Sequence, residues 1–171
     1  MNILFIVIAI ISMPFIVALF VKKAYSITGS VIILTTQKTV FNYLKIVKNQ
    51  EYYSKWVMRD PTMKKTFTGT DGMVGFIYAW DSSDKNVGKG EQEIKRIDHN
   101  QIDLEIRFEK PFKGIAQTSI STELLSENKT KVVWNMSGKS NYPMNIMNLF
   151  MGGILRKDIE KSLNQLKINL E

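Results

Sequence analysis

The chain has 171 residues, of which 44% are hydrophobic and 23% charged, and its formal net charge is +7. That length suits one globular domain with a short appendage, and the ordinary charged fraction argues against a disordered chain. The sequence has no cysteine and a single histidine. It therefore lacks the side chains for disulfides, for thiolate or paired-imidazole metal sites and for a cysteine nucleophile, and we expect no metal and no cofactor.

A long apolar segment comes first. Residues 3–21 are nineteen positions interrupted only by Ser12 and Pro14. As a helix they would measure roughly 28 Å, close to the thickness of the bilayer hydrocarbon. A cleaved signal peptide would carry a basic start, which Met1-Asn2 lacks. We therefore expect residues 1–23 to be a retained transmembrane anchor, with a buried core helix as the alternative.

The positive charge is concentrated directly after this segment. Lys22 and Lys23 follow it, so the positive-inside rule predicts a single-pass protein of the inner, cytoplasmic membrane whose C-terminal domain lies in the cytoplasm. Residues 22–65 hold nine basic and two acidic side chains, whereas residues 66–171 hold fourteen of each. The basic region fits either an anionic membrane surface or a solvated face. No nucleic-acid-binding motif accompanies it, so nucleic acid is not an expected partner.

Three elements are predicted before residue 62. Asp60-Pro61 ends the last of them, because the residue before a proline is pushed out of the helical conformation. Thr35-Thr36 can cap the first helix. After a short linker at Ala24-Tyr25, the expected elements are a strand at residues 27–34 and helices at residues 38–48 and 51–58.

Residues 62–139 read as turns separated by antiparallel strands. The clearest strand alternates Ile102, Leu104, Ile106 and Phe108 with charged side chains, which predicts one apolar and one solvated face. The charged positions are Asp103, Glu105, Arg107 and Glu109. Further strands are expected at residues 76–80, 88–97, 116–125 and 131–138.

A long helix is predicted from Pro143 or Met144 to the end of the sequence. Its apolar side chains recur every three or four residues and should lie against the sheet. They are Met147, Met151, Leu155, Ile159, Leu163, Leu166 and Leu170. The adjacent Gly152-Gly153 would allow close packing, a kink or a cavity mouth. The predicted fold class is α+β, with a curved antiparallel sheet of about seven strands around the C-terminal helix. We expect residues 24–171 to form this domain, with space for a ligand between sheet and helix.

The order of these elements resembles the START-like, polyketide cyclase/dehydrase and lipid-transport (SRPBCC) superfamily over roughly residues 26–171. Bacterial members with an N-terminal hydrophobic segment are the most similar. The resemblance is carried by Asp60-Pro61, by residues 72–80 (GMVGFIYAW), 87–92 (VGKGEQ) and 130–134 (TKVVW), and by a final helix ending in residues 163–167. It implies a helix-grip fold with a hydrophobic cavity that binds lipids, sterols, polyketides or other apolar molecules. Aromatases, cyclases and chaperone activators share this superfamily, so the fold alone does not define the activity.

The candidate ligand-binding residues are the apolar and aromatic side chains expected to face the space between sheet and helix; a filled core is the alternative. They are Trp56, Phe76, Tyr78, Trp80, Leu104, Ile106, Phe108, Ile120, Trp134, Met136, Met147 and Met151. No catalytic residue is predicted. Glu91 and Glu93 are weak acid/base candidates, and His99 lies in a predicted turn.

These observations predict a membrane-anchored binding protein that takes up a hydrophobic small molecule or lipid between the sheet and the C-terminal helix. Two alternatives stay open. One is a polyketide cyclase/dehydratase-like enzyme, and the other is a non-enzymatic accessory subunit with a membrane-protein partner.

Overall fold

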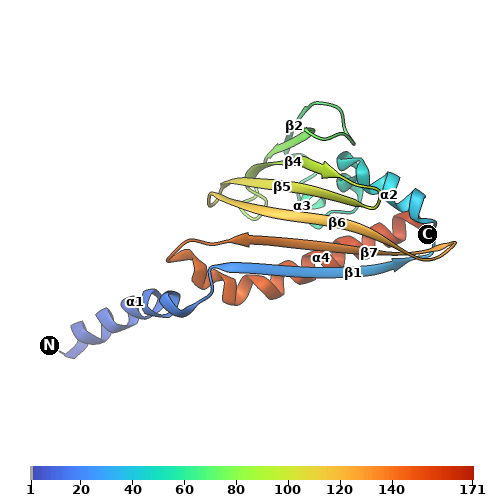
Figure 1. Ribbon diagram of the computed structural model, residues 1–171. Coiled ribbons are helices and arrows are strands. Elements are labelled where there is room, and N and C mark those ends of the chain that lie inside the picture. Colours follow the sequence, from blue (N-terminus) through green and yellow to red (C-terminus); the bar gives the residue numbers. More distant parts are fainter. Residues whose placement is uncertain (1) are drawn as a thin grey trace.

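A single antiparallel sheet forms the centre of the fold and curves around the C-terminal helix (Figure 1). The computed structural model describes the backbone of residues 2–171 and the side chains of residues 5–8 and 10–171. The seven strands follow the order β1-β7-β6-β5-β4-β3-β2, so the first strand pairs with the last and joins the two ends of the domain. Their bounds are β1 Ala24–Ile33, β2 Lys64–Thr68, β3 Ile77–Asp81, β4 Lys89–Ile97, β5 Gln101–Lys110, β6 Gly114–Ser126 and β7 Lys129–Lys139.

The two faces of the sheet differ as the alternation predicted. On β5, Ile102, Leu104 and Ile106 are buried toward the helices. On the outer face, the Arg107 guanidinium donates to carboxylates of Glu91, Glu93 and Glu105, at 2.7, 2.8 and 2.6 Å. The prediction of one apolar and one solvated face is therefore confirmed. The same contacts turn Glu91 and Glu93 away from the interior, which removes them as acid/base candidates.

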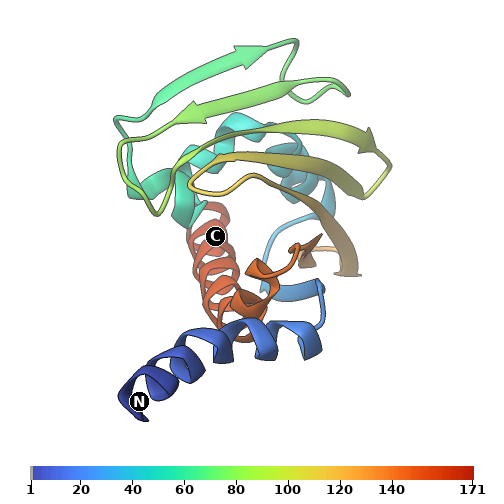
Figure 2. The ribbon, with the colours of Figure 1, turned by 90° about the vertical axis from the view of Figure 1, so that its left-hand side faces the viewer.

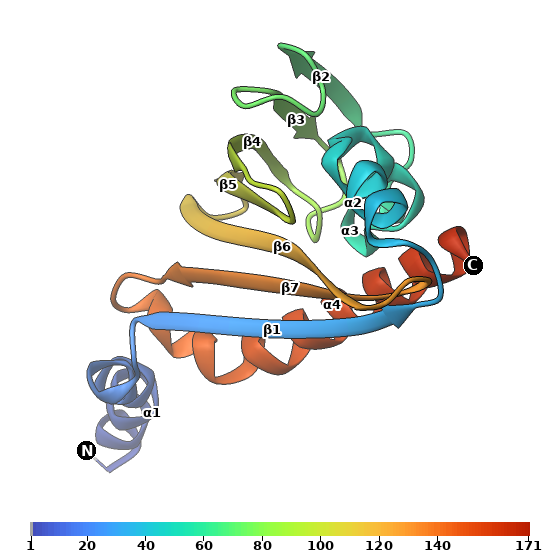
Figure 3. The same ribbon diagram turned by 45° about the vertical axis from the view of Figure 1, so that its right-hand side comes forward.

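Three short helices lie on the same side of the sheet as the C-terminal helix (Figure 3). They are α2 (Gln37–Lys45), the 3-10 helix η1 (Val47–Tyr52) and α3 (Lys55–Arg59). Thr36 caps α2 by accepting from the backbone N–H of Thr39 at 3.3 Å. The single helix predicted at residues 38–48 is wrong, because the chain is extended at Ile46. There the carboxylate of Asp71 accepts the backbone N–H groups of Val47 and Lys48, at 2.8 and 3.0 Å, and so starts a new turn.

The C-terminal helix grips the sheet through its second half. A 3-10 turn, η2 (Met144–Met147), leads into α4 (Asn148–Leu170). Ile159, Leu163 and Leu166 of α4 are buried in the core. Gly29 on β1 permits this approach, because a β-carbon there would lie 2.6 Å from Cγ2 of Ile159.

The first helix, α1 (Asn2–Phe20), projects from one end of the domain (Figure 1). Of the predicted anchor at residues 1–23, Met1 and the side chains of residues 2–4 and 9 lie outside the described part of the structure. Among the residues that the structure describes, no helix is both long and apolar enough to cross a bilayer. The expected linker is also absent, since Ala24 and Tyr25 already belong to β1 and pair with Lys139 and Gly138. Only a few residues therefore separate α1 from the sheet.

Candidate functional site

The twelve predicted ligand-binding residues fall into three groups. Seven are buried between the sheet and the helices: Phe76, Tyr78, Leu104, Ile106, Ile120, Trp134 and Met136. Trp56, Trp80 and Phe108 are partly buried against the same core. Met147 and Met151, by contrast, are 41% and 39% exposed. Their predicted place in the interior is wrong, because the first turns of α4 lie beside η2 and α1 and only the later turns pack into the core.

Aromatic rings fill much of the interior around Trp134. Its ring centroid lies 6.2 Å from that of Tyr53 and 6.0 Å from that of Trp56, and both pairs meet edge to face. The Trp134 indole N–H donates to Oγ1 of Thr118 at 2.8 Å, and that hydroxyl in turn donates to the Asn135 carbonyl at 2.8 Å. This part of the interior is therefore well packed, with its polar atoms paired.

Four polar side chains are buried in this apolar interior, and we call them the polar centre: Gln50, Tyr53, Tyr78 and Gln92. The amides of Gln50 and Gln92 are buried and bond to each other reciprocally, at 3.3 and 2.9 Å. Gln92 stands opposite Tyr78 in the β3–β4 register, and the Gln50 carbonyl accepts the backbone N–H of Tyr53 at 3.3 Å. The amide pair therefore links the segment before Tyr53 to β4, which pairs with the strand carrying Tyr78.

The two tyrosine hydroxyls of the polar centre are unsatisfied. Both residues are fully buried, and neither hydroxyl has a hydrogen-bond partner among the described residues. Burial raises the pKa of each phenol well above its ordinary value, with smaller contributions from Tyr43 at Tyr53 and from Glu51 at Tyr78. Both groups therefore stay neutral at physiological pH, and each can donate and accept hydrogen bonds.

The interior offers little for acid/base chemistry. In the described part of the chain, the buried polar side chains are all neutral: Gln50, Ser54, Gln92, Thr118, Thr122, Thr130, Asn145 and Ser162. His99 is exposed in the turn between β4 and β5, as predicted. No cluster of potential metal ligands occurs among the described residues. This composition suits binding of a largely apolar molecule through a few neutral hydrogen bonds.

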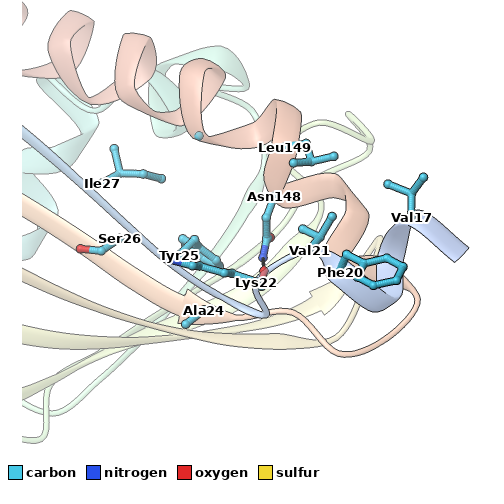
Figure 4. Close-up of a pocket in the computed structure, with 11 residues that line it drawn as sticks. Val17, Phe20, Val21, Lys22, Ala24, Tyr25, Ser26, Ile27, Asn148 and Leu149 are labelled. Carbon is cyan, nitrogen blue, oxygen red and sulfur yellow. Dashed lines mark hydrogen bonds between the residues drawn. The ribbon is translucent and has the colours of Figure 1, made fainter. Parts of the chain in front are cut away.

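An open groove of about 650 Å³ lies where α1, β1 and α4 meet (Figure 4). Apolar side chains dominate its walls, and Lys22 and Asn148 add polar groups. The lining residues are Val17, Phe20, Val21, Lys22, Ala24, Tyr25, Ser26, Ile27, Asn148, Leu149 and Gly152. Ile27 on its wall also belongs to the buried core. None of the twelve predicted residues lines it.

A second, smaller hollow of about 340 Å³ lies between α3 and α4. Its wall includes Tyr53 of the polar centre and three cationic side chains, Lys55, Arg59 and Lys161. Two of these cations are already paired, Lys55 with Asp158 and Arg59 with Asp84. Tyr53 forms part of the wall of this hollow although the residue itself is fully buried.

Sequence reasoning missed Gln50, Tyr53 and Gln92. Gln92 carried a detectable signal, because it lies two residues before Ile94 in a strand and therefore shares its inward face. A polar side chain at an inward position indicates a buried polar contact. Gln50 and Tyr53 had no such signal, since they lie in and after a 3-10 helix with no simple periodicity.

No protein-family model matches this sequence, and no curated protein matches it. Solved structures do match its fold. Norcoclaurine synthase from Thalictrum flavum, in complex with dopamine and hydroxybenzaldehyde, is 10% identical over 91% of this chain and 93% of that chain, with a TM-score of 0.63. The Aha1 dimer from Colwellia psychrerythraea is 13% identical over 86% and 96%, with a TM-score of 0.60. Ara h 8.0201 is 10% identical over 86% and 97%, with a TM-score of 0.58.

These likenesses define the class of fold. Together with the seven-stranded sheet and the long C-terminal helix, they show that the chain has the START-like helix-grip fold. The fold class predicted from the sequence is confirmed to that extent. At 10 to 13% identity the likeness carries fold alone, and function must be argued from the site.

Proposed function

We propose that this is a membrane-attached binding protein of the SRPBCC superfamily, which takes up a hydrophobic small molecule or lipid between the sheet and α4. The observation that carries the proposal is the pair of buried, unpartnered hydroxyls of Tyr53 and Tyr78. Leaving a buried hydroxyl unsatisfied costs about 1–3 kcal/mol. A bound molecule with one polar group would offset that cost, and the apolar side chains around the polar centre would contact its hydrophobic body.

Membrane attachment through α1 is part of the same proposal. It is supported by the exposed apolar side chains along that helix, which in water would be costly. Lys22 and Lys23 follow the helix and would face the cytoplasmic headgroups, which puts the domain in the cytoplasm. The groove beside Val17 and Phe20 would then open next to the lipid. A membrane-derived ligand would reach it at high effective concentration.

The fold of the structural neighbours supports a binding role. The norcoclaurine synthase structure holds dopamine and hydroxybenzaldehyde, two small molecules with aromatic rings and hydroxyl groups. An interior that combines buried rings with neutral phenols, as at Tyr53 and Trp134, suits ligands of comparable mixed character.

The test is mass spectrometry of organic extracts from the full chain purified from its membranes. Wild type is compared with the double variant Tyr53→Phe/Tyr78→Phe, which keeps both rings and removes only the hydroxyls. Tyr52→Phe is the matched control, because Tyr52 is exposed. We expect one class of hydrophobic molecule to be enriched in wild type and in Tyr52→Phe, and to be depleted in the double variant. Equal extracts from all three proteins would contradict the role of the polar centre.

A non-enzymatic accessory subunit of a membrane complex is the second candidate. The observation favouring it is the tight packing of aromatic side chains around Trp134, which leaves that region filled. Wild-type extracts without any enriched molecule, combined with stable co-purification of a specific membrane protein, would favour this role. A cyclase- or dehydratase-like enzyme would need an acid or base in the interior, where the described buried polar side chains are neutral.

A further inference from the structure

The end of α1 is fixed to the domain by two asparagine side chains. The buried Asn145 amide donates to the carbonyls of Ala18 and Val21, at 2.6 and 2.8 Å. The Asn148 amide donates to the Lys22 carbonyl at 3.0 Å (Figure 4). It also donates to the Lys23 carbonyl at 3.0 Å. The Ala18 carbonyl is one that a helix end leaves without an intrahelical partner, and the other three carbonyls belong to the short segment between α1 and β1. Side-chain hydrogen bonds therefore tie the last turn of α1 and the segment after it to η2 and the start of α4.

This attachment places η2 at the level of the apolar part of α1. Ala18, within the apolar segment, is only 1% exposed. It lies two residues before the end of α1 and four residues before Lys22. Figure 2 shows the start of α4 close to α1. If the end of α1 is embedded in lipid up to Lys22, η2 reaches the same depth.

The side chains around this junction are apolar and exposed. Met147, Phe150 and Ile154 recur at three- and four-residue steps and so share one face. Leu149 also lines the groove that contains Val17 and Phe20, which makes the apolar surface continuous with α1. We call the following set the lipid-facing end: Tyr142, Met144, Met147, Leu149, Phe150, Met151 and Ile154.

Unpaired cations surround the lipid-facing end. Lys22, Lys23, Lys139, Arg156 and Lys157 are exposed. None of them takes part in an ion pair within the described part of the chain. The sequence has no acidic residue before Glu51 and none between Glu127 and Asp158. Apolar side chains bordered by cations without nearby acids complement an anionic bilayer, with its apolar interior and negative headgroups.

We propose that the lipid-facing end inserts into the interfacial region of an anionic bilayer as a second contact beside α1. The inference rests on the proposed attachment of α1 to the membrane. It adds a fixed orientation, in which the domain lies with η2 and the first two turns of α4 against the lipid. The groove between α1, β1 and α4 then opens at the headgroup level.

The absence of cysteine allows a direct test. Single cysteines are introduced as Phe150→Cys at the lipid-facing end and Leu34→Cys after β1, at the opposite end of that strand from α1. These positions are similarly exposed, 66% and 62%. Each full-length variant is labelled with an environment-sensitive fluorophore and reconstituted into vesicles of phosphatidylcholine and phosphatidylglycerol. Doxyl-labelled lipids then report which probe contacts the bilayer.

We expect the label at position 150 to shift its emission to shorter wavelength and to be quenched by doxyl lipids, while the label at position 34 stays in water. Replacing Lys22 and Lys23 by glutamine should reduce the preference of the position-150 label for anionic over neutral vesicles, by roughly fivefold for each lysine. If the protein floats with the vesicles but both labels stay in water, the second contact is overturned and attachment by α1 stands. If the protein does not float with the vesicles, the proposed membrane attachment itself fails.

Discussion

The two halves of α4 belong to one continuous helix but have opposite surroundings. In the second half, Ile159, Leu163 and Leu166 are buried against the sheet. In the first half, Leu149, Phe150 and Ile154 are more than half exposed, although they are equally apolar. The difference teaches that apolar periodicity along a helix identifies a face that avoids water. It does not identify what covers that face, which can be a protein core or a lipid surface.

The glycine pair Gly152-Gly153 lies within the exposed first half of α4. A β-carbon added at Gly152 or Gly153 would meet no atom within 4 Å. The sequence left close packing, a kink or a cavity mouth as possible roles for this pair. The open space around both positions argues against close packing. Gly152 lies on the wall of the groove, which fits a cavity mouth.

Alanine substitutions in the two halves of α4 should have very different effects on the free energy of unfolding. We expect Leu163→Ala to lower the free energy of unfolding by about 2–5 kcal/mol, because it leaves a cavity in the core. Phe150→Ala should change it by less than about 0.5 kcal/mol, because the residue is 66% exposed. Urea denaturation of the full chain in detergent measures both. Equal losses would show that the first half of α4 also packs against protein.

Replacing glycine by alanine should have opposite effects on stability at the start of α4 and on β1. Gly152→Ala and Gly153→Ala should each raise the free energy of unfolding by about 1 kcal/mol, because alanine is the better helix former and nothing blocks its side chain. Gly29→Ala should lower it, because the new β-carbon would lie 2.6 Å from Ile159. The same denaturation experiment compares all three. If Gly152→Ala or Gly153→Ala destabilised the protein, another part of the protein would have to contact the first half of α4.

Removing the buried Tyr53 hydroxyl should change the stability of the interior in a way that depends on bound lipid. In the protein stripped of bound lipid, Tyr53→Phe should raise the free energy of unfolding by about 1 kcal/mol, since it deletes a buried group without a partner. The exposed Tyr52→Phe serves as the control and should have no measurable effect. Thermal unfolding before and after extraction of lipid gives the comparison. A loss of stability in the stripped Tyr53→Phe protein would show that the hydroxyl is already satisfied within the protein.

The outer face of the sheet is exposed like the first half of α4, but its side chains are charged and not apolar. Hydrogen bonds from Arg107 and then Lys95 lower the pKa of Glu93, and bonds from Gln117 and then Arg107 lower that of Glu105. A carboxylate whose pKa is lower in the folded protein than its ordinary 4.5 stabilises the fold at pH values above 4.5. This stabilisation is lost as the pH falls through the pKa of the folded state.

Arg107→Met should therefore cost about 1 kcal/mol or less at pH 7, and the cost should shrink at pH 3. Denaturation at both pH values measures it. A cost that is the same at pH 3 as at pH 7 would mean that packing of the arginine stem, and not its charge, matters here.

Much of the fold could be predicted from the sequence, because it rests on local periodicity. The alternation around Leu104 fixed the two faces of the sheet, and Asp60-Pro61 ended α3 as expected. Met147 and Met151 were misplaced because helical spacing continues unchanged past the point where α4 leaves the core. The polar centre was missed because it depends on contacts between residues far apart in sequence, such as Gln50 with Gln92.

The central claim is that the interior binds a hydrophobic molecule through the hydroxyls of Tyr53 and Tyr78. Native mass spectrometry of the full chain released from its membranes tests it most directly, because it reports the mass and number of bound molecules on each protein. We predict one bound molecule per chain in wild type and in Tyr52→Phe, and its loss from Tyr53→Phe/Tyr78→Phe. A wild-type protein without bound molecules, or a double variant that keeps them, would contradict the claim.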